Sequence, residues 1–383
     1  MVLGYFVDGP LYVDKNGKMY GVSYDDRLFS RYLKFSDTLH LCMRVKKIED
    51  TSRLNEIRLP NVTLTACINL SSILFLYHIS EAEKTIRKVL LECDIAVVRM
   101  QGAISLIAVK LCQEMDKPYV IEMVACVWDQ LWNHSIKGKV AAYPMKKLVQ
   151  KAVMQSTAVL YVTNEFLQKR YPTKGASIGC SDVELSKNCV SIIEKRLKKI
   201  ESISNKFIIG TTAAVNVRYK GQQYIIKAIA KLKKEGITHF EYQIVGNGNQ
   251  DFLKSIIKKY GVEKEVKLIG GMPHEQVFNW LDSIDIYTQP SRQEGLPRAL
   301  IEAMSRGLPA FGARTGGIPE LLHEEYIFSN TRHNIEEICQ ILKKYTIESM
   351  KKQAILNYEK AKDYDEELLS KKRESFYRKY LKI

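Results

Sequence analysis

The stretch from residue 289 to residue 304 places two glutamates around the expected start of a helix. It reads Gln-Pro-Ser-Arg-Gln-Glu-Gly-Leu-Pro-Arg-Ala-Leu-Ile-Glu-Ala-Met, so Glu294 lies in a loop after a strand and Glu302 lies inside the helix. Gly295 permits backbone conformations that other residues resist, and Pro297 suits a first helical turn. Free N–H groups at a helix start attract phosphate, and carboxylates accept hydrogen bonds from hydroxyl groups. The pair therefore predicts a pocket for a ligand carrying both groups, unless both glutamates are simply solvated.

A cationic turn precedes this stretch. Arg218-Tyr219-Lys220-Gly221 follows the strand expected at 207–210. A guanidinium and an ammonium aimed at the oxygens of a departing phosphate supply electrostatic catalysis. The turn could therefore supply cations to a departing phosphate, although its four residues would also suit an ordinary basic turn.

These residues need a scaffold, and the first half of the chain alternates short apolar strands with amphipathic helices. Helices are expected at 25–33, 80–91 and 104–114, and strands at 2–7, 39–45, 94–100, 119–124 and 159–162. Such alternation favours a parallel sheet with helices on both faces.

The pattern starts again at Phe207, after a polar and basic stretch. Strands are expected at 207–210, 241–245, 266–269 and 284–288, with helices at 222–233, 251–260 and 274–280. We therefore expect an α/β protein with two Rossmann-like doubly wound domains, residues 1–205 and 206–361, facing a central cleft. A C-terminal helix, 362–383, is expected to pack back on the first domain. Ligands of such sheets bind outside the carboxyl ends of the strands.

The motif Glu294-Gly295-x-Pro297 followed by Glu302 resembles the paired-glutamate motif of retaining nucleotide-sugar glycosyltransferases of family GT4, which have the GT-B fold. The stretches 243–248, 266–270, 282–287 and 315–320 resemble the strands and glycine turns around that motif. The resemblance extends from about Phe207 to Glu324. It implies an acceptor-binding first domain and a donor-binding second domain.

The resemblance also implies roles for the donor site. Glu302 would bind the ribose hydroxyls of the nucleotide, and Glu294 would lie near the transferred sugar. Lys220 and Arg218 would stabilise the diphosphate. Arginine usually stands five positions before the lysine in this family, whereas Val215 stands there in this chain. The remaining donor-binding residues that it implies are Gly246, Gly295, Leu296 and Pro297.

In the first domain the resemblance implies three further residues. His134 would lie beside the donor sugar, with Asp129 as a second candidate. The loop from Asp8 to Gly17 would face the phosphates and the acceptor, and Gly17 is its candidate residue. A structural role is the alternative for a lone histidine such as His134.

The chain carries a formal net charge of +15, and part of this charge is clustered. Residues 137–174 contain eight basic residues and one acid, Glu165. The segment Tyr143–Val153 mixes Lys146, Lys147 and Lys151 with apolar Met145, Leu148, Val149 and Val153. A basic amphipathic helix of this kind can lie in the headgroup layer of an anionic membrane. We therefore expect a peripheral enzyme and a lipid-linked or saccharide acceptor, against the alternative of a solvated helix and a soluble acceptor.

The sequence has no signal-peptide pattern and no run of about 18–20 apolar residues, which favours a cytoplasmic protein, possibly at the inner face of the cell membrane. Its eight cysteines show no metal spacing and are expected to be reduced and buried. We expect no nicotinamide cofactor, because Asp251 replaces the last glycine of a dinucleotide fingerprint, and no metal, because arginine and lysine are available for the diphosphate. The alternatives are a nucleotide-sugar epimerase and, more distantly, a basic nucleic-acid-binding protein, for which the sequence contains no binding motif.

Overall fold

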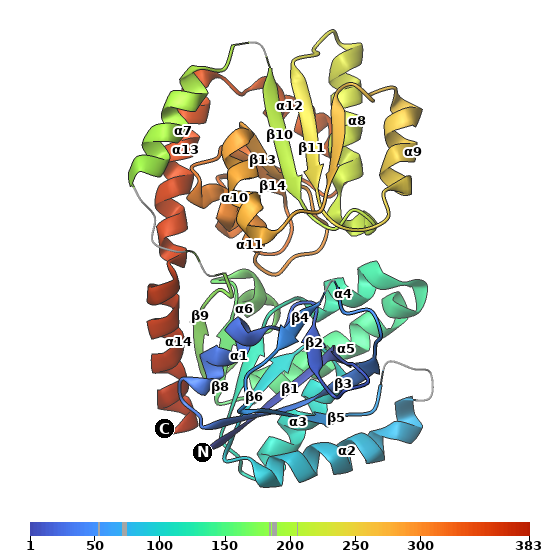
Figure 1. Cartoon of the computed structure of the whole chain (residues 1–383), viewed down its shortest axis with the longest axis vertical. Coiled ribbons are helices and arrows are strands. Elements are labelled where there is room, and N and C mark those ends of the chain that lie inside the picture. Colours follow the sequence, from blue (N-terminus) through green and yellow to red (C-terminus); the bar gives the residue numbers. More distant parts are fainter. Residues whose placement is uncertain (53, 71–74, 184, 186–189, 205) are drawn as a thin grey trace. The chain divides into compact units, whose positions relative to one another are not determined.

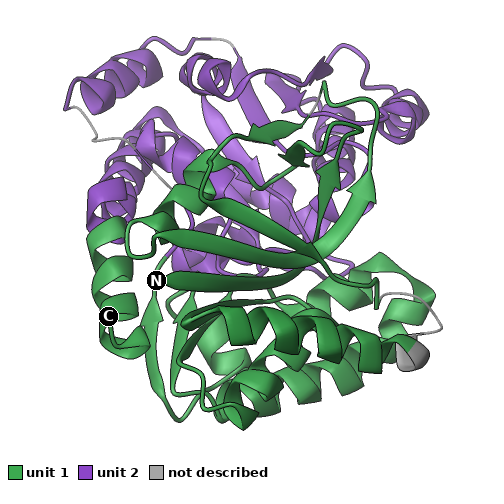
Figure 2. Cartoon of the chain, turned by 60° about the horizontal axis from the view of Figure 1, so that its bottom comes forward, with its two compact units in different colours: residues 1–180, 370–383 green, residues 181–369 purple. Residues whose placement is uncertain are grey.

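The computed structural model describes residues 1–52, 54–70, 75–183, 185, 190–204 and 206–383. Contacts divide the chain into two compact units, shown in Figure 2. Unit 1 comprises Met1–Cys180 and Ser370–Ile383, and unit 2 comprises Ser181–Leu369. The boundary therefore differs from the position expected near residue 205. The reason is helix α7 (Val190–Glu201), which packs against α13 (Ile347–Ala361) of unit 2.

Unit 1 is built on a mainly parallel sheet (Figure 1). Its parallel strands follow the order β5-β3-β1-β6-β7-β8-β9, and the short strands β2 and β4 pair antiparallel beside the end of β1. The strands of unit 1 are β1 (Val2–Val13), β2 (Met19–Gly21), β3 (Thr38–Lys47), β4 (Asn55–Ile57), β5 (Val62–Ala66), β6 (Ile95–Met100), β7 (Tyr119–Met123), β8 (Ala158–Tyr161) and β9 (Ala176–Gly179).

Helices cover this sheet, with α3 packed on β1 and β6 and lying beside α2 and α5. The helices of the unit are α1 (Asp26–Leu33), α2 (Phe75–Glu92), α3 (Ala103–Glu114), α4 (Val127–His134), α5 (Ile136–Met154) and α6 (Phe166–Arg170). The end of α14 (Glu366–Leu381) also belongs to unit 1.

Strand β1 is longer than the sequence predicts. The expected loop from Asp8 to Gly17 is strand as far as Val13, because β1 resumes its pairing with β3 at Pro10 after an irregularity that follows Phe6. Only the turn from Asp14 to Lys18 is left as a loop, so the expectation of a loop is wrong for residues 8–13, while the expectation that this region faces the phosphates and the acceptor stays a prediction.

Unit 2 contains a fully parallel sheet in the order β12-β11-β10-β13-β14-β15 (Figure 1). Its strands are β10 (Phe207–Thr212), β11 (Phe240–Val245), β12 (Val266–Gly270), β13 (Ile286–Gln289), β14 (Ala310–Ala313) and β15 (Ile327–Phe328). Besides α7 and α13, its helices are α8 (Gln222–Lys234), α9 (Asp251–Tyr260), α10 (His274–Ser283), α11 (Arg298–Ser305) and α12 (Asn334–Lys343), and 3-10 turns lie at η1 (Arg218–Lys220), η2 (Ile318–Glu320), η3 (Glu324–Tyr326) and η4 (Lys362–Tyr364). Strand and helix side chains such as Ile209, Ile244 and Ile225 form one buried core.

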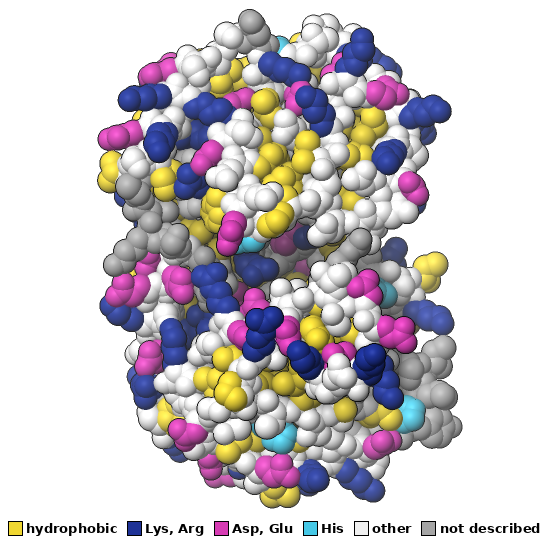
Figure 3. All heavy atoms as spheres, in the orientation of Figure 1, with side chains coloured by type: hydrophobic (Ala, Val, Ile, Leu, Met, Phe, Trp, Pro, Cys, Tyr) yellow, Lys and Arg dark blue, Asp and Glu magenta, His cyan; other side chains and the backbone are white. Residues whose placement is uncertain are grey.

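Several surface and sequence features complete the description. Lysine and arginine side chains are spread over the face drawn in Figure 3, with acidic side chains among them. Among the residues described, none of the helices combines the length and the apolar character needed to cross a bilayer. The seven described cysteines are all buried, as expected, and Cys189 lies outside the described residues.

Candidate active site

The cationic turn and the first glutamate meet in unit 2. Lys220 lies in η1, and its Nζ is 2.7 Å from Oε1 of Glu294. Two loops must touch for this to happen. Gly221 has a φ of +79°, and a Cβ there would lie 1.9 Å from the carbonyl oxygen of Pro290, so only glycine allows the approach. The carbonyl of Tyr219 also accepts a hydrogen bond from the backbone N–H of Arg292, at 2.7 Å.

A chain of buried polar groups extends from this pair into the sheet. The side-chain amide of Gln289 donates to Oε1 of Glu294 at 3.0 Å and to the hydroxyl of Ser291 at 2.9 Å. Its carbonyl oxygen accepts from the Tyr287 hydroxyl at 3.0 Å, which also contacts the Thr212 hydroxyl at 3.0 Å. Gln289 is therefore fixed on both sides and in turn orients the carboxylate of Glu294.

Burial is the main reason that the pKa of Tyr287 lies well above its usual value, and the negative charges of Glu302 and Glu294 raise it further. The tyrosine therefore stays protonated, and its hydroxyl can act as a donor to Gln289. The sequence analysis missed both Tyr287 and Gln289. The available signal was a glutamine directly after the strand expected at 284–288.

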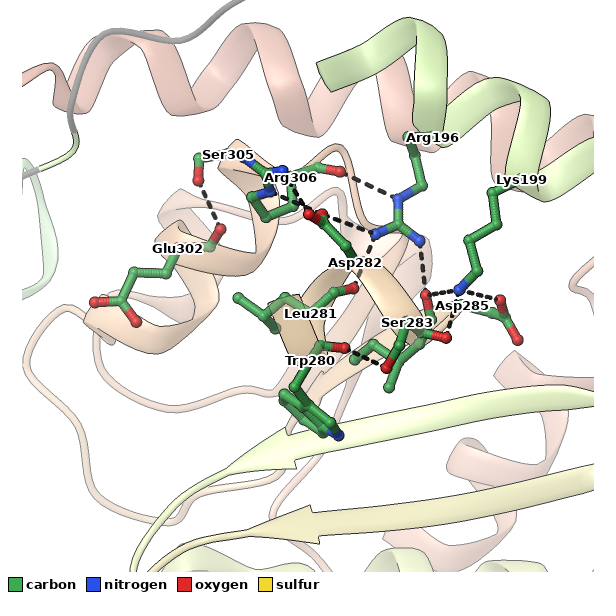
Figure 4. Close-up of polar contacts among 11 residues, drawn as sticks. Arg196, Lys199, Trp280, Leu281, Asp282, Ser283, Asp285, Glu302, Ser305 and Arg306 are labelled. Carbon is green, nitrogen blue, oxygen red and sulfur yellow. Dashed lines mark hydrogen bonds and ion pairs between the residues drawn. The ribbon is translucent and has the colours of Figure 1, made fainter. Parts of the chain in front are cut away.

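The second glutamate has a different environment. Nε2 of His274, the first residue of α10, lies 3.3 Å from Oε1 of Glu302 on α11. His274 starts its helix as predicted, but its contact with Glu302 was not foreseen. Figure 4 shows the Glu302 carboxylate pointing away from the cluster of Arg196, Asp282 and Arg306 that lies beside the same helix. The two carboxylates thus have separate partners, Lys220 for Glu294 and His274 for Glu302.

Backbone contacts around Glu294 explain the glycines nearby. Gly316 has a φ of +56°, and a Cβ there would lie 2.4 Å from the carbonyl oxygen of Glu294. The carbonyl of Gly295 accepts a hydrogen bond from Gly317 at 2.6 Å. The turn after β14 therefore packs directly on the loop that carries the glutamate.

Gly246 follows β11 and has a packing role of its own. A Cβ at Gly246 would lie 1.8 Å from the carbonyl oxygen of Ala213, so the loops after β10 and β11 can approach each other only with glycine at this position. Its N–H donates to the carbonyl of Gly270 at 2.9 Å.

Helix α11 begins directly after the loop that carries Glu294, and its start has no side-chain cap. Pro297 is its N-cap residue and forms no side-chain capping hydrogen bond, while Leu296 and Pro297 are both buried. The backbone N–H groups of the first turn lack partners within the helix and can receive an anion. Arg218 lies in η1 with Lys220, but its guanidinium carbon stands 4.4 Å from the ring centre of Phe252.

The residues expected in unit 1 occupy three different settings. His134 is exposed at the last position of α4. Asp129 pairs with Arg170, whose Nη1 is 3.1 Å from its Oδ2. Gly17 has a φ of +80° in the tight turn between β1 and β2, so the turn alone accounts for glycine there.

A pocket of about 340 Å³ lies in unit 1, close to the carboxyl end of β6. The sequence analysis did not identify it, because its walls come from segments far apart in the chain. Its lining residues are Gly9, Pro10, Tyr12, Val22, Ser23, Tyr24, Leu28, Arg99 and Gln101.

Two doubly wound α/β units, one carrying a lysine–glutamate pair and a second glutamate at the carboxyl ends of its parallel strands, define a nucleotide-sugar glycosyltransferase of the GT-B class. The family model described as glycosyl transferases group 1 matches residues 193–363. Protein CapJ of Staphylococcus aureus is 30% identical over 315 residues, which cover 81% of this chain and 78% of CapJ. The chain belongs to the group 1 glycosyltransferases, which confirms the resemblance and decides against an epimerase or a nucleic-acid-binding protein.

Two further comparisons are informative. The amylovoran biosynthesis glycosyltransferase AmsK of Erwinia amylovora is 33% identical over 175 residues, which cover 43% of this chain and 42% of AmsK. The solved structure of HepE from Anabaena, in complex with UDP and glucose, is 17% identical and matches 98% of each chain with a TM-score of 0.62. The likeness to HepE shows that the two chains share a fold.

Proposed function

We propose that this glycosyltransferase moves a sugar from a nucleotide diphosphate to an acceptor hydroxyl, with retention of configuration, during synthesis of a cell-surface polysaccharide. The observation that carries the proposal is the Lys220–Glu294 pair beside the uncapped start of α11. The polymer class is suggested by AmsK, whose name assigns it to amylovoran biosynthesis.

In this proposal, Lys220 and the start of α11 stabilise the leaving nucleotide diphosphate. An ammonium group has three donors, so Lys220 can keep its contact with Glu294 and still bind phosphate oxygens. The N–H groups at the start of α11 add a positive end of a helix dipole. Arg218 contributes a second cation if its guanidinium leaves the ring of Phe252 when the donor binds.

In the same proposal, Glu302 receives the ribose hydroxyls. Its side chain is only 17% exposed, and its carboxylate contacts His274. Four lone-pair positions on a carboxylate leave room for two hydroxyl donors. His274 then acts as a positioning residue for Glu302.

Glu294 faces the transferred sugar. The acceptor hydroxyl attacks the anomeric carbon from the face that the diphosphate leaves, the glycosidic bond to phosphate breaks, and the departing phosphate oxygen takes the acceptor's proton. Retention follows because attack and departure occur on one face. Gln289 keeps the Glu294 carboxylate in one orientation throughout.

In unit 1, the pocket beside Arg99 and Gln101 supplies the acceptor site. Tyr12 and Tyr24 offer aromatic surfaces for a sugar ring, and Gln101 offers donor and acceptor groups. His134 is retained as the candidate beside the donor sugar. Asp129 fits a structural role better, since Arg170 already neutralises it.

We propose that the reaction needs no metal ion, since Lys220, Arg218 and a helix start can together neutralise a diphosphate. Among the described residues, no group of three or more His, Cys, Asp or Glu side chains could hold a metal ion. Activity retained in excess chelator would support this proposal, and activity restored only by a divalent cation would refute it.

The first prediction tests the donor site through Glu302. Glu302→Ala should weaken nucleotide binding by about 1–3 kcal/mol, the range for a hydrogen bond to a charged group, without unfolding the protein. Titration calorimetry with UDP, GDP and ADP measures this and also identifies the base. Glu325→Ala, at an exposed position, is the matched control. Equal affinities in a folded Glu302→Ala variant and in the native protein would refute the assignment.

A further inference from the structure

Helix α5 has two apolar stripes on different sides, and only one of them packs into unit 1. The inner stripe includes Ala142, Val149 and Val153, which are fully buried. The outer stripe includes Ile136, Val140 and Tyr143, whose exposed fractions are 83%, 78% and 60%. The outer residues follow one another at intervals of four and three positions, so they line one face of the helix.

This arrangement corrects the sequence interpretation of the same helix. The sequence analysis assigned membrane contact to Tyr143–Val153, with Val149 and Val153 on the lipid side, but both valines belong to the core. Three exposed apolar residues, Ile136, Val140 and Tyr143, lie ahead of Pro144 instead. Only Leu148 of the four expected apolar residues is exposed.

The outer stripe is held on a stable support. Helices α4 and α5 form a hairpin in which a Cβ at Gly138 would lie 2.2 Å from the carbonyl oxygen of Leu131. The Ser135 hydroxyl caps α5 by accepting from the Gly138 N–H at 3.0 Å. On α4, the rings of Trp128 and Trp132 stack with centres 5.1 Å apart. The hairpin is visible in Figure 1.

Lysines surround the outer stripe. The ammonium groups of Lys139 and Lys147 lie over the rings of Trp132 and Tyr143, 5.6 Å and 5.7 Å from their centres. Lys137 adds a third cation in the first turn of α5. Within the described part of the chain, these three lysines form no ion pair with a carboxylate, so their charge is available to an anionic partner.

We propose that the outer face of the α4–α5 hairpin, defined by Trp132, Ile136, Val140 and Tyr143 with Lys137, Lys139 and Lys147, docks on an anionic lipid bilayer. Exposed aliphatic side chains can enter the acyl boundary, tryptophan and tyrosine suit the interface, and lysines meet the anionic headgroups. The surface deepens the proposed function, on which it rests for its purpose, because it would hold the enzyme where a lipid-linked acceptor lies.

Vesicle sedimentation of the full chain tests the surface. Vesicles of phosphatidylcholine with phosphatidylglycerol should bind the native protein at about 0.01 M salt, and binding should largely vanish at about 1 M as the screening length falls from about 30 to 3 Å. Reversing Lys137, Lys139 and Lys147 to Glu should reduce binding about 100-fold or more, since each lysine contributes a factor of about five. Ile136→Ser with Val140→Ser should reduce it about tenfold.

Matched controls change the same residue types elsewhere. Reversing the exposed lysines 258, 259 and 264 to Glu, or changing the exposed Ile355 and Leu356 to Ser, should leave binding within about threefold. Thermal unfolding and UDP calorimetry check each variant for folding and for the donor site. Native protein that binds UDP but sediments with no vesicles, or equally with pure phosphatidylcholine, overturns the docking surface and leaves the transferase proposal standing. Native protein that binds the anionic vesicles but no nucleotide would support the docking surface and contradict the proposed donor site.

Discussion

The carboxylate of Glu294 is held from two directions, by the ammonium of Lys220 at 2.7 Å and by the side-chain amide of Gln289 at 3.0 Å. These two contacts differ in chemistry. The first joins opposite charges and can be shared with a bound diphosphate, whereas the second is a neutral donor buried in the sheet. Substitutions of the two partners should therefore affect different kinetic constants.

Lys220→Ala should lower turnover by about 10²–10³-fold, the usual effect of removing one preorganised group that stabilises developing charge. Steady-state kinetics measure it, with a sugar donor of the nucleotide that calorimetry identifies. Lys227→Ala removes a lysine of α8 that lies over the Tyr260 ring and is the control. Arg218→Ala should act in the same direction as Lys220→Ala. A normal rate in Arg218→Ala would confine the catalytic role to Lys220.

Gln289→Leu should lower turnover about tenfold while the donor KM stays within about twofold, because it frees the Glu294 carboxylate to rotate without removing a charge that binds the nucleotide. Tyr287→Phe should act in the same way but more weakly, since Gln289 then loses only one of its partners. A loss of stability with unchanged turnover in both variants would mean that the buried chain has only a structural role.

At the same scale, the sequence predicted those candidate site residues that belong to a recognisable motif or turn. The sequence could place the segments of Lys220 and Glu294 at one edge of the sheet, because parallel strands bring their carboxyl ends together, but it did not predict the contact between the two side chains. Gln289 and His274 could not be predicted as site residues, since their importance depends on contacts made across the sheet and between helices. The ion pair of Asp129 with Arg170 could not be predicted either, because Arg170 stands well away in the sequence and is brought close only by folding, and a role of Asp129 in the site stays a prediction.

At the scale of elements, short apolar runs separated by amphipathic segments predicted the repeated strand–helix pattern of both units, because a strand buried on both faces reads as a near-continuous apolar run. The prediction failed where local chemistry suggests a loop. Asp8-Gly9-Pro10 contains typical turn residues, yet Pro10 continues β1 because its pairing with β3 resumes there. The short strands β2 and β4 carry too few residues to show a period.

Helix α7 was assigned to the wrong side of the domain boundary, and one buried side chain explains its true place. Arg196 donates to the carbonyls of Ile284, Leu281 and Arg306 at 2.6, 2.9 and 3.1 Å (Figure 4). Burial lowers the pKa of Arg196 to about 10, which still leaves it charged at neutral pH. These bonds tie α7 to the carboxyl ends of α10 and α11, and α11 carries Glu302.

Arg196→Met should therefore lower the free energy of unfolding by about 3–5 kcal/mol, since it removes the guanidinium donor of the Leu281 and Arg306 carbonyls and leaves the Ile284 carbonyl with only Lys199 as a side-chain donor. Denaturant unfolding measures the loss. Lys198→Met, at an exposed position of the same helix, should change stability by less than about 0.5 kcal/mol. Similar losses in the two variants would show that the effect belongs to the helix in general and not to the buried bonds.

At the scale of the whole molecule, the chain leaves unit 1 after Cys180 and returns to it at Ser370. The returning segment enters a buried polar site. The Tyr377 hydroxyl donates to Glu122 on β7, which also accepts from Tyr32 at 2.8 Å and pairs with Arg99 at 3.0 Å. The rings of Tyr377 and Phe35 lie 5.2 Å apart. Unit 1 thus depends on residues from both ends of the chain.

Tyr377→Ala should consequently destabilise unit 1 by about 3–5 kcal/mol, because it opens a cavity in the core and removes a donor from the buried Glu122 carboxylate. Hydrogen exchange of the full chain can locate the effect. Peptides from β6 and β7 should lose protection, whereas those from β10, β11 and β13 should keep theirs, since unit 2 has its own core. Leu368→Ala, at an exposed position of α14, is the control and should leave both sets unchanged. Loss of protection in β10 and β11 as well would mean that the two units unfold as one, and unchanged protection in β6 and β7 would mean that the C-terminal segment contributes nothing to unit 1.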